Sequence, residues 1–339
     1  MNNEQSNVQL RLRRVPEGDA VPEDFETVEA PMPEFGENQV LVETHYVGVD
    51  AALRLIVRDS DEFLFRVKPG DLVHGSIAGR VVESNAPEFS VGDFVTGSLG
   101  VQRYAVAAPA QLERCDISQA PLSTWLGGFG VSGLTAYFAL IEECKPQPGQ
   151  TVLINGAAGA VGSMAGQIAK LAGARVIGLT GSDEKCNWLT GELGYDVAIN
   201  YRKGDLYAAL CEAAPDRIDV IFDNVGGDIL DESLRLIGMR GTVLLCGSTS
   251  QYSEANMRGP ANYIWLGTMR ARLQGFVVFD YADRYAEARA RMSRWLAEGA
   301  LQLPEYVVAG DVGDFPVAFA DLYAGKNLGK TVLKLPAAD

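Results

Sequence analysis

Three glycines recur at every third position between a short apolar run and a segment with helical spacing. The apolar run covers residues 151–154, the glycines are Gly156, Gly159 and Gly162, and residues 163–172 continue as a helix. Glycine lets the chain turn tightly and approach a pyrophosphate, whose charge is stabilised by free N–H groups at a helix N-terminus. Glycines that only pack a helix on a strand would give the same spacing. The order of strand, turn and helix nevertheless favours a dinucleotide-binding turn.

The end of the next apolar run bears on which dinucleotide binds. NAD-preferring sites usually place Asp or Glu there, to accept hydrogen bonds from the ribose hydroxyls. Here residues 175–179 are followed by Thr-Gly-Ser, and Lys185 lies one helical turn beyond Ser182. A lysine in a first helical turn opposes the macrodipole, so a bound 2′-phosphate would explain its position. The sequence therefore favours NADPH, and a solvated lysine offset by Asp183 and Glu184 is the alternative.

The elements around this turn indicate the fold. Short apolar runs alternate with helical stretches after residue 151, which is typical of a parallel sheet covered by helices on both faces. The runs cover residues 151–154, 175–179, 197–200, 219–222 and 242–246. A helix over 132–143 precedes them, and a long amphipathic helix over 283–298 follows them.

The first third of the chain is different, because it consists mostly of β-rich runs separated by Gly-Asp turns. These runs cover residues 40–49, 78–83 and 104–107. Strand-like segments over 306–308 and 330–335 are expected to rejoin this first domain. The α/β domain is then an insertion, with both ends of the chain in the β domain.

Composition excludes several classes of function. The chain has 339 residues, enough for two domains, and a formal net charge of -15, which repels phosphate backbones and anionic lipids. No apolar run approaches the roughly 18 residues of a membrane span. The five cysteines are scattered without a CxxC pair and are expected to be reduced. We therefore expect a soluble cytoplasmic protein that binds neither nucleic acid nor membrane.

Six motifs in order along the chain resemble those of one family of reductases. They are GAAGAVG from Gly156, GSDEKC from Gly181, DNVGG from Asp223, CGSTSQY from Cys246, GFVVFD from Gly275 and GKNLGK from Gly325. Together they are similar to the zinc-independent medium-chain dehydrogenases/reductases that include leukotriene B4 12-hydroxydehydrogenase, prostaglandin reductase and alkenal double-bond reductase. The similarity is strong over residues 125–335 and weaker before them.

This resemblance implies a GroES-like catalytic domain over 1–125, an inserted Rossmann NADP-binding domain over 126–300, and a return to the catalytic domain over 301–339. It also implies a homodimer that uses NADPH to reduce an activated carbon–carbon double bond. The residues that the motifs assign to NADP(H) are Gly159, Ala160, Val161, Lys185, Tyr201, Asn224, Cys246, Gly247, Ser248, Tyr252, Phe276, Val277, Val278 and Asn327.

Simpler explanations remain for several of these residues. Cys246 ends a buried strand, where a small apolar side chain is common. Residues 276–278 are also compatible with a plain strand, and Asn224 could serve turn chemistry alone.

No zinc site is expected from the sequence. Zinc-dependent relatives bind catalytic zinc with Cys and His ligands, whereas the two histidines here, His45 and His74, are isolated and more typical of structural or surface positions. Alcohol oxidation is disfavoured without a Lewis acid, whereas reduction of a conjugated double bond requires no metal.

Tyr252 is the candidate catalytic residue. Hydride addition to the β-carbon of an α,β-unsaturated carbonyl leaves an enolate, which must be stabilised and then protonated. The Tyr252 phenol is expected to bind the nicotinamide ribose or the enolate and to assist protonation. An aromatic loop anchor is the alternative, and water or a ribose hydroxyl could also be the proton donor.

One departure from the family pattern concerns the substrate. Relatives often have Val-Asp-Pro-Tyr-Met-Arg near the active site, where this chain has Val-Asp-Ala-Ala-Leu-Arg with Ala52 at the aromatic position. The substrates of the family therefore cannot be transferred directly. The first hypothesis is an enone or enal reductase, with an NADPH:quinone reductase and a non-catalytic NADPH-binding protein as alternatives.

Overall fold

Alternating apolar residues in the first third of the chain form antiparallel strands. The computed structural model describes residues 6–58, 66–254 and 256–336. Two predicted runs are strands with the predicted limits, β3 (Val40–Val49) and β6 (Tyr104–Ala107), and the third lies within β4 (Ser76–Ser84). The predicted C-terminal segments are present as β14 (Glu305–Ala309) and β15 (Lys330–Lys334).

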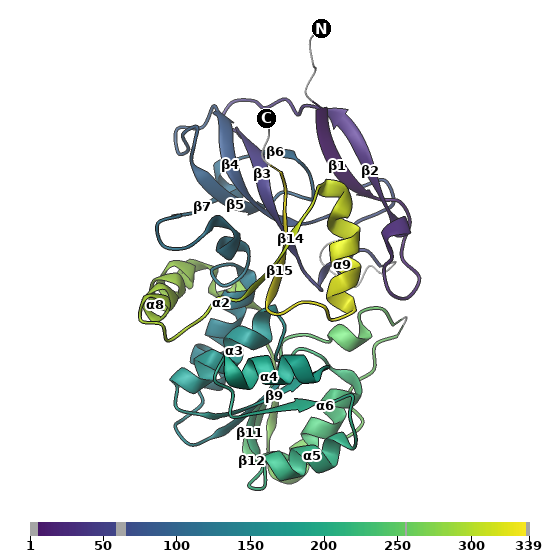
Figure 1. Cartoon of the computed structure of the whole chain (residues 1–339), viewed down its shortest axis with the longest axis vertical. Helices are drawn as coiled ribbons and strands as arrows, with labels where there is room; N and C mark the ends of the chain where they lie inside the picture. The colour runs from purple at the N-terminus through teal and green to yellow at the C-terminus, as the bar shows by residue number, and fades with distance from the viewer. Residues whose placement is uncertain (1–5, 59–65, 255, 337–339) are drawn as a thin grey trace. The chain divides into compact units, whose positions relative to one another are not determined.

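These strands form a seven-stranded sheet with the order β14-β15-β3-β4-β5-β7, in which β6 also pairs with β3. In Figure 1, β15 lies beside β3, although some 280 residues separate them in sequence, and the register pairs Thr331 with Val49. Leu10, Val42 and Phe319 belong to the core that this sheet shares with α9 (Phe315–Tyr323). The remaining elements of this part are β1 (Ser6–Leu12), η1 (Pro22–Asp24), β2 (Phe25–Pro31), α1 (Leu53–Ile56), β5 (Phe94–Ser98), η2 (Pro109–Gln111), β7 (Glu113–Arg114), η3 (Leu122–Leu126) and η7 (Val312–Asp314).

The second part contains the predicted parallel sheet, with the order β10-β9-β8-β11-β12-β13. Its strands are β8 (Thr151–Asn155), β9 (Arg175–Thr180), β10 (Val197–Asn200), β11 (Ile218–Asp223), β12 (Ile237–Leu245) and β13 (Arg272–Gly275). Its helical segments are α2 (Val131–Phe138), η4 (Ala139–Cys144), α3 (Ala160–Leu171), α4 (Asp183–Gly191), α5 (Leu206–Ala213), α6 (Gly227–Leu234), η5 (Thr249–Gln251), α7 (Ile264–Met269), η6 (Val278–Arg284) and α8 (Tyr285–Ala297). This order is that of the doubly wound dinucleotide-binding fold.

Alternation along the strands explains why helices cover both faces of the sheet. Leu153 and Ile177 belong to a core that includes Leu210 of α5 and Leu230 of α6. Gly178, the next residue of β9, points to the opposite face, where an added Cβ atom would lie 2.9 Å from the ring of Tyr195. Because successive side chains of a strand point to opposite faces, apolar runs without alternation are buried on both sides.

Three local features differ from the sequence prediction. The helix expected over 132–143 is an α-helix only to Phe138 and continues as a π-helix to Cys144 before Pro146. Strand β12 begins at Ile237, earlier than expected, and includes Arg240 in a left-handed conformation. Strand β13 was not predicted, and it ends at Gly275, so the interpretation of residues 276–278 as a plain strand is wrong.

The chain divides into two compact units. The first comprises Met1–Gly127, Glu305–Lys326 and Thr331–Asp339, and the second comprises Gly128–Pro304 and Asn327–Lys330. The domain limits expected at 125/126 and 300/301 stay predictions. Every residue that the motifs assign to NADP(H) lies in the second unit.

Candidate cofactor site

The candidate phosphate-binding turn joins the end of β8 to α3. Gly156 has a φ of +71°, a left-handed conformation that glycine adopts without the steric cost of a Cβ atom. Gly159 is the N-cap of α3, and Ala160 and Val161 begin its first turn, where N–H groups have no acceptor within the helix. These three residues are partly exposed, so an anion can approach their amides.

Gly162 lies where α3 crosses this turn. A Cβ atom at Gly162 would lie 2.3 Å from the carbonyl oxygen of Gly156 and 2.8 Å from the Cα atom of Ala157. Both are backbone atoms, so they cannot move aside without reshaping the turn. The first glycine of the pattern is therefore required for its conformation and the third for close packing.

The strand register places most of the predicted cofactor residues along one edge of the sheet. Asn155 pairs with Leu179 on one side and with Asp223 on the other, Asp223 pairs with Leu245, and Leu245 pairs with Gly275. Predicted residues directly follow three members of this row, namely Asn224, Cys246 and Phe276. The glycine-rich turn also follows the row, at Asn155. Ligands of doubly wound sheets bind outside the carboxyl ends of the strands, and this edge is such a place.

Asn327 is brought to the same turn from the far end of the chain. Asn327 is buried, and its Nδ2 donates to the carbonyl oxygen of Gly329 at 2.8 Å. The Gly329 N–H in turn donates to the carbonyl oxygen of Ala158 at 2.9 Å. The segment 327–330 therefore covers the glycine-rich turn.

Two cations gather at the end of β9. Ser182 caps α4, and its Oγ accepts from the Lys185 N–H at 3.2 Å. The pKa of Lys185 is lowered, first by burial and then by the nearby positive charge of Arg202. The Arg202 guanidinium also lies 5.8 Å from the ring centre of Tyr201. Lys185 and Arg202 are thus close enough to repel each other, with Tyr201 beside Arg202, and an anion bound between the two cations would relieve that repulsion.

Of the two acidic residues that the sequence suggested could offset the charge of Lys185, Glu184 does so in part, because its charge raises the pKa of Lys185, whereas Asp183 is bound elsewhere. Its carboxylate accepts from Asn200 at 2.7 Å and forms an ion pair with Lys203. Arg202 was missed by sequence reasoning, because only the turn after β10 brings it back to the start of α4. Its position directly after Tyr201 was the one available signal.

A buried carboxylate holds the strand ends together beneath this edge. Asp223 accepts from Asn155 Nδ2 at 2.8 Å and from the Gly226 N–H at 2.9 Å. Its backbone carbonyl accepts from the N–H groups of Cys246 and Gly247. Burial raises the pKa of Asp223 to about 6. The Asn224 side chain is part of the same assembly, because its Nδ2 donates to the Asn155 carbonyl oxygen at 2.8 Å.

We expect Asp223 to make stability depend on pH. Its folded pKa of about 6 lies above its ordinary value of 3.8, so the native state binds the proton more tightly and stability falls as pH rises through this range. The difference corresponds to roughly 3 kcal/mol. The melting temperature of Asp223→Asn relative to wild type should therefore rise between about pH 4 and about pH 7. A constant difference across that range would contradict the assignment.

Tyr252 lies just after the short helix η5, with only 9% of its surface exposed. Its hydroxyl oxygen accepts from the Ser248 N–H at 3.2 Å, and a Cβ atom at Gly247 would lie 3.0 Å from that oxygen. Burial raises the pKa of Tyr252, so the phenol keeps its proton at neutral pH and can donate it. Burial also raises the pKa of the Cys246 thiol to about 12, which excludes a reactive thiolate.

Residues 276–278 connect the end of β13 to the start of η6. Val278 is buried, whereas Val277 is exposed, and the ring of Phe276 lies 6.1 Å from that of Tyr281. The segment follows Gly275, the last residue of the register row, so its backbone begins at the same edge of the sheet as Asn224 and Cys246. The Val277 side chain is exposed to solvent, so its assignment to the cofactor stays a prediction.

A pocket of about 660 Å³ borders this edge within the second unit. Its lining residues are Tyr201, Leu206, Val225, Gly226, Gly227, Asp228, Ile229, Glu232, Ser250, Gln251, Glu254, Asn256 and Arg258. The volume lies in the range of ligand pockets, and Tyr201 joins it to the pair of cations at the end of β9.

Within residues 6–58, 66–254 and 256–336, no three His, Cys, Asp or Glu side chains are grouped so that they could bind a metal ion. The Nε2 atom of His45 lies 3.8 Å from Oε2 of Glu43, and both residues belong to β3.

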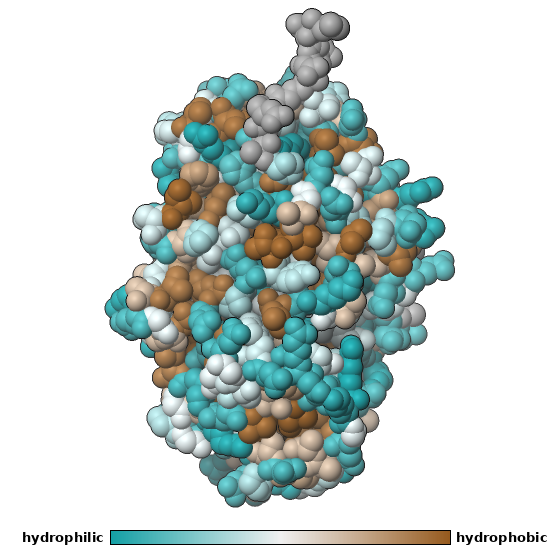
Figure 2. Space-filling model, viewed as in Figure 1, coloured by the Kyte–Doolittle hydropathy of each residue, from teal (hydrophilic) through white to brown (hydrophobic). Residues whose placement is uncertain are grey.

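No helix of the described chain has the length and apolarity that crossing a membrane requires. On the face shown in Figure 2, hydrophobic residues form separate patches divided by hydrophilic ones.

Comparisons with known proteins identify both parts of the chain. Residues 8–115 match the family model for the N-terminal domain of oxidoreductase, and residues 160–295 match the model for zinc-binding dehydrogenase. YfmJ of Bacillus subtilis strain 168, named as an NADP-dependent oxidoreductase, is 40% identical over 97% of this chain and 98% of its own length. The NADP(+)-dependent 2-alkenal reductase of Nicotiana tabacum is 36% identical over 98% of each chain. Prostaglandin reductase 1 of Bos taurus is 37% identical over 92% of this chain and 94% of its own.

Solved structures show the same similarity. The crystal structure of CurA from Vibrio vulnificus in complex with NADPH matches with a TM-score of 0.91 and 32% identity, covering 98% of this chain and 100% of that one. Escherichia coli quinone oxidoreductase complexed with NADPH matches with a TM-score of 0.78 over 96% of this chain and 99% of that one. At 22% identity, the latter match shows a shared fold alone.

Proposed function

The chain belongs to the zinc-independent medium-chain dehydrogenase/reductase family of leukotriene B4 12-hydroxydehydrogenase, prostaglandin reductase and alkenal double-bond reductase, and from this premise we propose its reaction. It is an NADP-dependent oxidoreductase that transfers hydride to the β-carbon of an α,β-unsaturated ketone or aldehyde. One observation carries the proposal. The glycine-rich turn, the cations Lys185 and Arg202, and the turn that carries Tyr252 all lie at the carboxyl ends of the parallel strands.

The residues at this edge fit NADP(H). Because Gly162 has no Cβ atom, α3 packs closely on the turn. Ala160 and Val161 can therefore present their amides to a pyrophosphate. Lys185 and Arg202 provide positive charge for a 2′-phosphate, and Tyr201 lies beside them. The other residues that we assign to the cofactor are Gly159, Asn224, Cys246, Gly247, Ser248, Tyr252, Phe276, Val277, Val278 and Asn327. Bound NADPH supplies the hydride, and the chain supplies position and a proton.

The chain itself must bind the cofactor, stabilise the developing enolate and protonate it. Tyr252 is suited to the last two tasks because its phenol stays protonated and its oxygen is held by the Ser248 N–H. The O–H group remains available as a donor to the enolate oxygen or to the α-carbon.

Tyr252→Phe should lower kcat about tenfold and raise the Kd for NADPH by a smaller factor, because the proposal also places this phenol beside the cofactor. The factor for kcat is smaller than for the loss of a sole general acid, because water or a ribose hydroxyl can replace the phenol. Steady-state kinetics with a saturating enone, together with a fluorescence titration of NADPH, would measure both quantities. Unchanged kcat would remove Tyr252 from the mechanism.

The proposed substrate class follows from the family, but one residue difference concerns the shape of the substrate that fits. Ala52, at the N-cap of α1, stands where relatives often carry tyrosine, so we propose that the chain accepts a bulkier or differently oriented enone. Quinone reduction is the second candidate, because the fold is shared with a quinone oxidoreductase. A non-catalytic NADPH-binding protein is the third.

One experiment separates these functions. NADPH oxidation is followed with a panel of alkenals, enones and quinones, and each product is identified by mass spectrometry. We expect a saturated carbonyl compound with its C=O intact. Preferential turnover of quinones would favour the second candidate, and binding of NADPH without turnover of any panel member would favour the third.

We further propose that the enzyme is a cytoplasmic homodimer. The edge strand β13 and the segment after it carry exposed apolar side chains at Leu273, Val277 and Phe279. An unpaired edge with apolar side chains favours pairing with a second copy. Light scattering should give twice the 36.4 kDa mass of the chain. A single-chain mass at micromolar concentration would contradict the dimer.

A further inference from the structure

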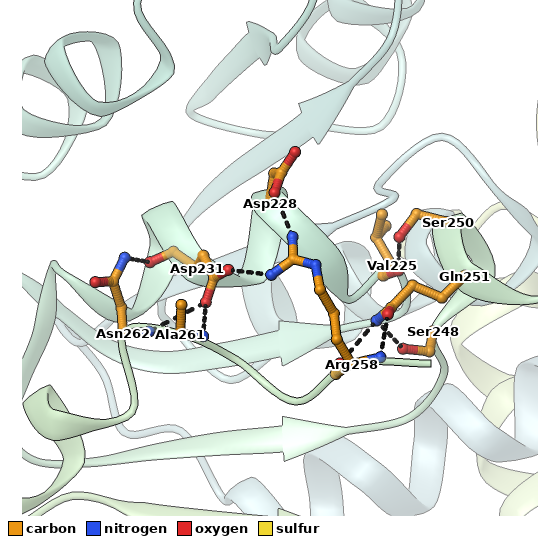
Figure 3. Close-up of polar contacts among 9 residues, drawn as sticks. All are labelled: Val225, Asp228, Asp231, Ser248, Ser250, Gln251, Arg258, Ala261 and Asn262. Carbon is orange, nitrogen blue, oxygen red and sulfur yellow. Dashed lines mark hydrogen bonds and ion pairs between the residues drawn. The ribbon is translucent and has the colours of Figure 1, made fainter. Parts of the chain in front are cut away.

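A buried carboxylate of α6 organises the segment that follows Tyr252. The Asp231 side chain is 9% exposed and accepts from the N–H groups of Ala261 at 2.6 Å and Asn262 at 3.2 Å. Its second oxygen accepts from Nη1 of Arg258 at 2.9 Å. Figure 3 shows Arg258, Ala261 and Asn262 converging on Asp231. A carboxylate with so little exposure is stable only because these donors neutralise it.

Arg258 connects Asp231 to the turn that carries Tyr252. Its side chain also pairs with Asp228, but that carboxylate is 95% exposed, so Asp231 is the stronger anchor. The Arg258 backbone is bound by one side chain, Gln251, whose Oε1 accepts from the Arg258 N–H at 2.8 Å and whose Nε2 donates to its carbonyl oxygen at 3.3 Å. Gln251 is buried and directly precedes Tyr252.

The opposite side of the same turn is held by the end of β11. The Thr249 N–H donates to the Asn224 carbonyl oxygen, and the Ser250 N–H donates to the Val225 carbonyl oxygen, both at 3.1 Å. A Cβ atom at Gly226 would lie 2.2 Å from Ser248 Oγ, so the turn packs closely on α6. The turn is therefore held between β11 on one side and Arg258 on the other (Figure 3).

We propose that Asp231 and Arg258 are positioning residues that fix the Ser248–Tyr252 turn for the reaction. This inference rests on the proposed function, because it gives Tyr252 a role in turnover. Arg258 binds Gln251 through its backbone and Asp228 and Asp231 through its side chain, so its effect on Tyr252 passes through Gln251. The Asp231 charge fixes the Arg258 side chain, and the Arg258 backbone then keeps Gln251 and the turn in one arrangement.

Hydrogen exchange tests this positioning without any turnover. In the full-length protein without substrate, Arg258→Met should speed amide exchange in residues 248–252 about tenfold or more, and should leave peptides of β8 and α3 unchanged. Arg258→Lys, which retains a cation for Asp231, should stay within about threefold of wild type. Arg235→Met is the matched control, because Arg235 forms an ion pair with Glu232 at the end of the same helix without contacting the turn. Unchanged exchange in Arg258→Met would overturn the proposal.

Kinetics test the consequence for the reaction. At saturating NADPH, Arg258→Met should lower kcat by up to about tenfold, the loss expected for Tyr252→Phe, and Asp231→Asn should lower it in the same direction. A double variant with Tyr252→Phe should lose little more than Arg258→Met alone, because both changes act through one residue. Additive losses, or a raised Kd for NADPH with unchanged kcat, would overturn the proposal.

The proposed function can fail separately from this inference. If wild type turns over no enone, the enzymatic proposal fails, and hydrogen exchange still decides whether Arg258 fixes the turn. Melting temperatures of Arg258→Met and Asp231→Asn show whether a loss of activity reflects unfolding. A variant that melts like wild type but has lost kcat supports positioning, and one that keeps kcat contradicts it.

Discussion

Gly162→Ala should lower the affinity for NADPH by more than about 100-fold, although it adds only one methyl group. The new Cβ atom would lie 2.3 Å from the Gly156 carbonyl oxygen, and that oxygen belongs to the turn that approaches the pyrophosphate. The carbonyl oxygen of Gly162 is itself bound by the Tyr195 hydroxyl at 2.6 Å, so α3 cannot easily shift away. The strain must therefore displace the turn, and with it the amides of Ala160 and Val161.

Gly191→Ala is the matched control, because this helical glycine has no atom within 4 Å of an added Cβ. It should bind NADPH like wild type and be at least as stable, since alanine favours a helix by up to about 1 kcal/mol over glycine. Fluorescence titration of NADPH and a melting curve would measure both variants. If Gly162→Ala binds NADPH like wild type, the pyrophosphate does not bind at this turn.

Lys185→Ala should weaken NADPH binding about 100-fold and change NADH binding by less than about threefold. The two dinucleotides differ only in the 2′-phosphate, so the difference isolates the charge at the end of β9. Arg202→Ala should act in the same direction, since Arg202 lies close enough to lower the pKa of Lys185. A double variant tests whether the two cations bind one phosphate, because their effects are then not additive.

Lys203→Ala is the control for these variants. Lys203 directly follows Arg202 but pairs with Asp183, so its loss should affect both dinucleotides little. Added salt should weaken NADPH binding to wild type more than to Lys185→Ala, because screening then acts on fewer charges. If Lys185→Ala weakens NADH as much as NADPH, the lysine is structural and the argument for NADPH selectivity is wrong.

The parallel sheet could be predicted because its signals are local. A strand buried on both faces requires an unbroken apolar run, and the runs at 151–154 and 175–179 fall within β8 and β9. The order of strand, glycines and helix predicts the turn for the same reason. Strand β13 escaped prediction because Arg272 and Gln274 break its apolar pattern, and its edge position buries little of it.

The candidate site was only partly predictable, because its remaining contacts join distant residues. The approach of Arg202 to Lys185 depends on how β10 pairs with β9, which no local pattern contains. The contact of Gly329 with Ala158 bridges about half of the chain. The role of Asp231 could not be foreseen, because an acidic residue in an amphipathic helix is normally solvated.

The contact between segment 327–330 and the glycine-rich turn has a consequence for biosynthesis. A nascent chain that ends at Pro304 already contains all six strands of the parallel sheet but lacks the segment that covers the turn between Gly156 and α3. Domains generally fold as units while synthesis proceeds from the N-terminus. The sheet should therefore form on the ribosome before the nucleotide can bind with full affinity, and NADPH should stabilise this protein only near the end of translation.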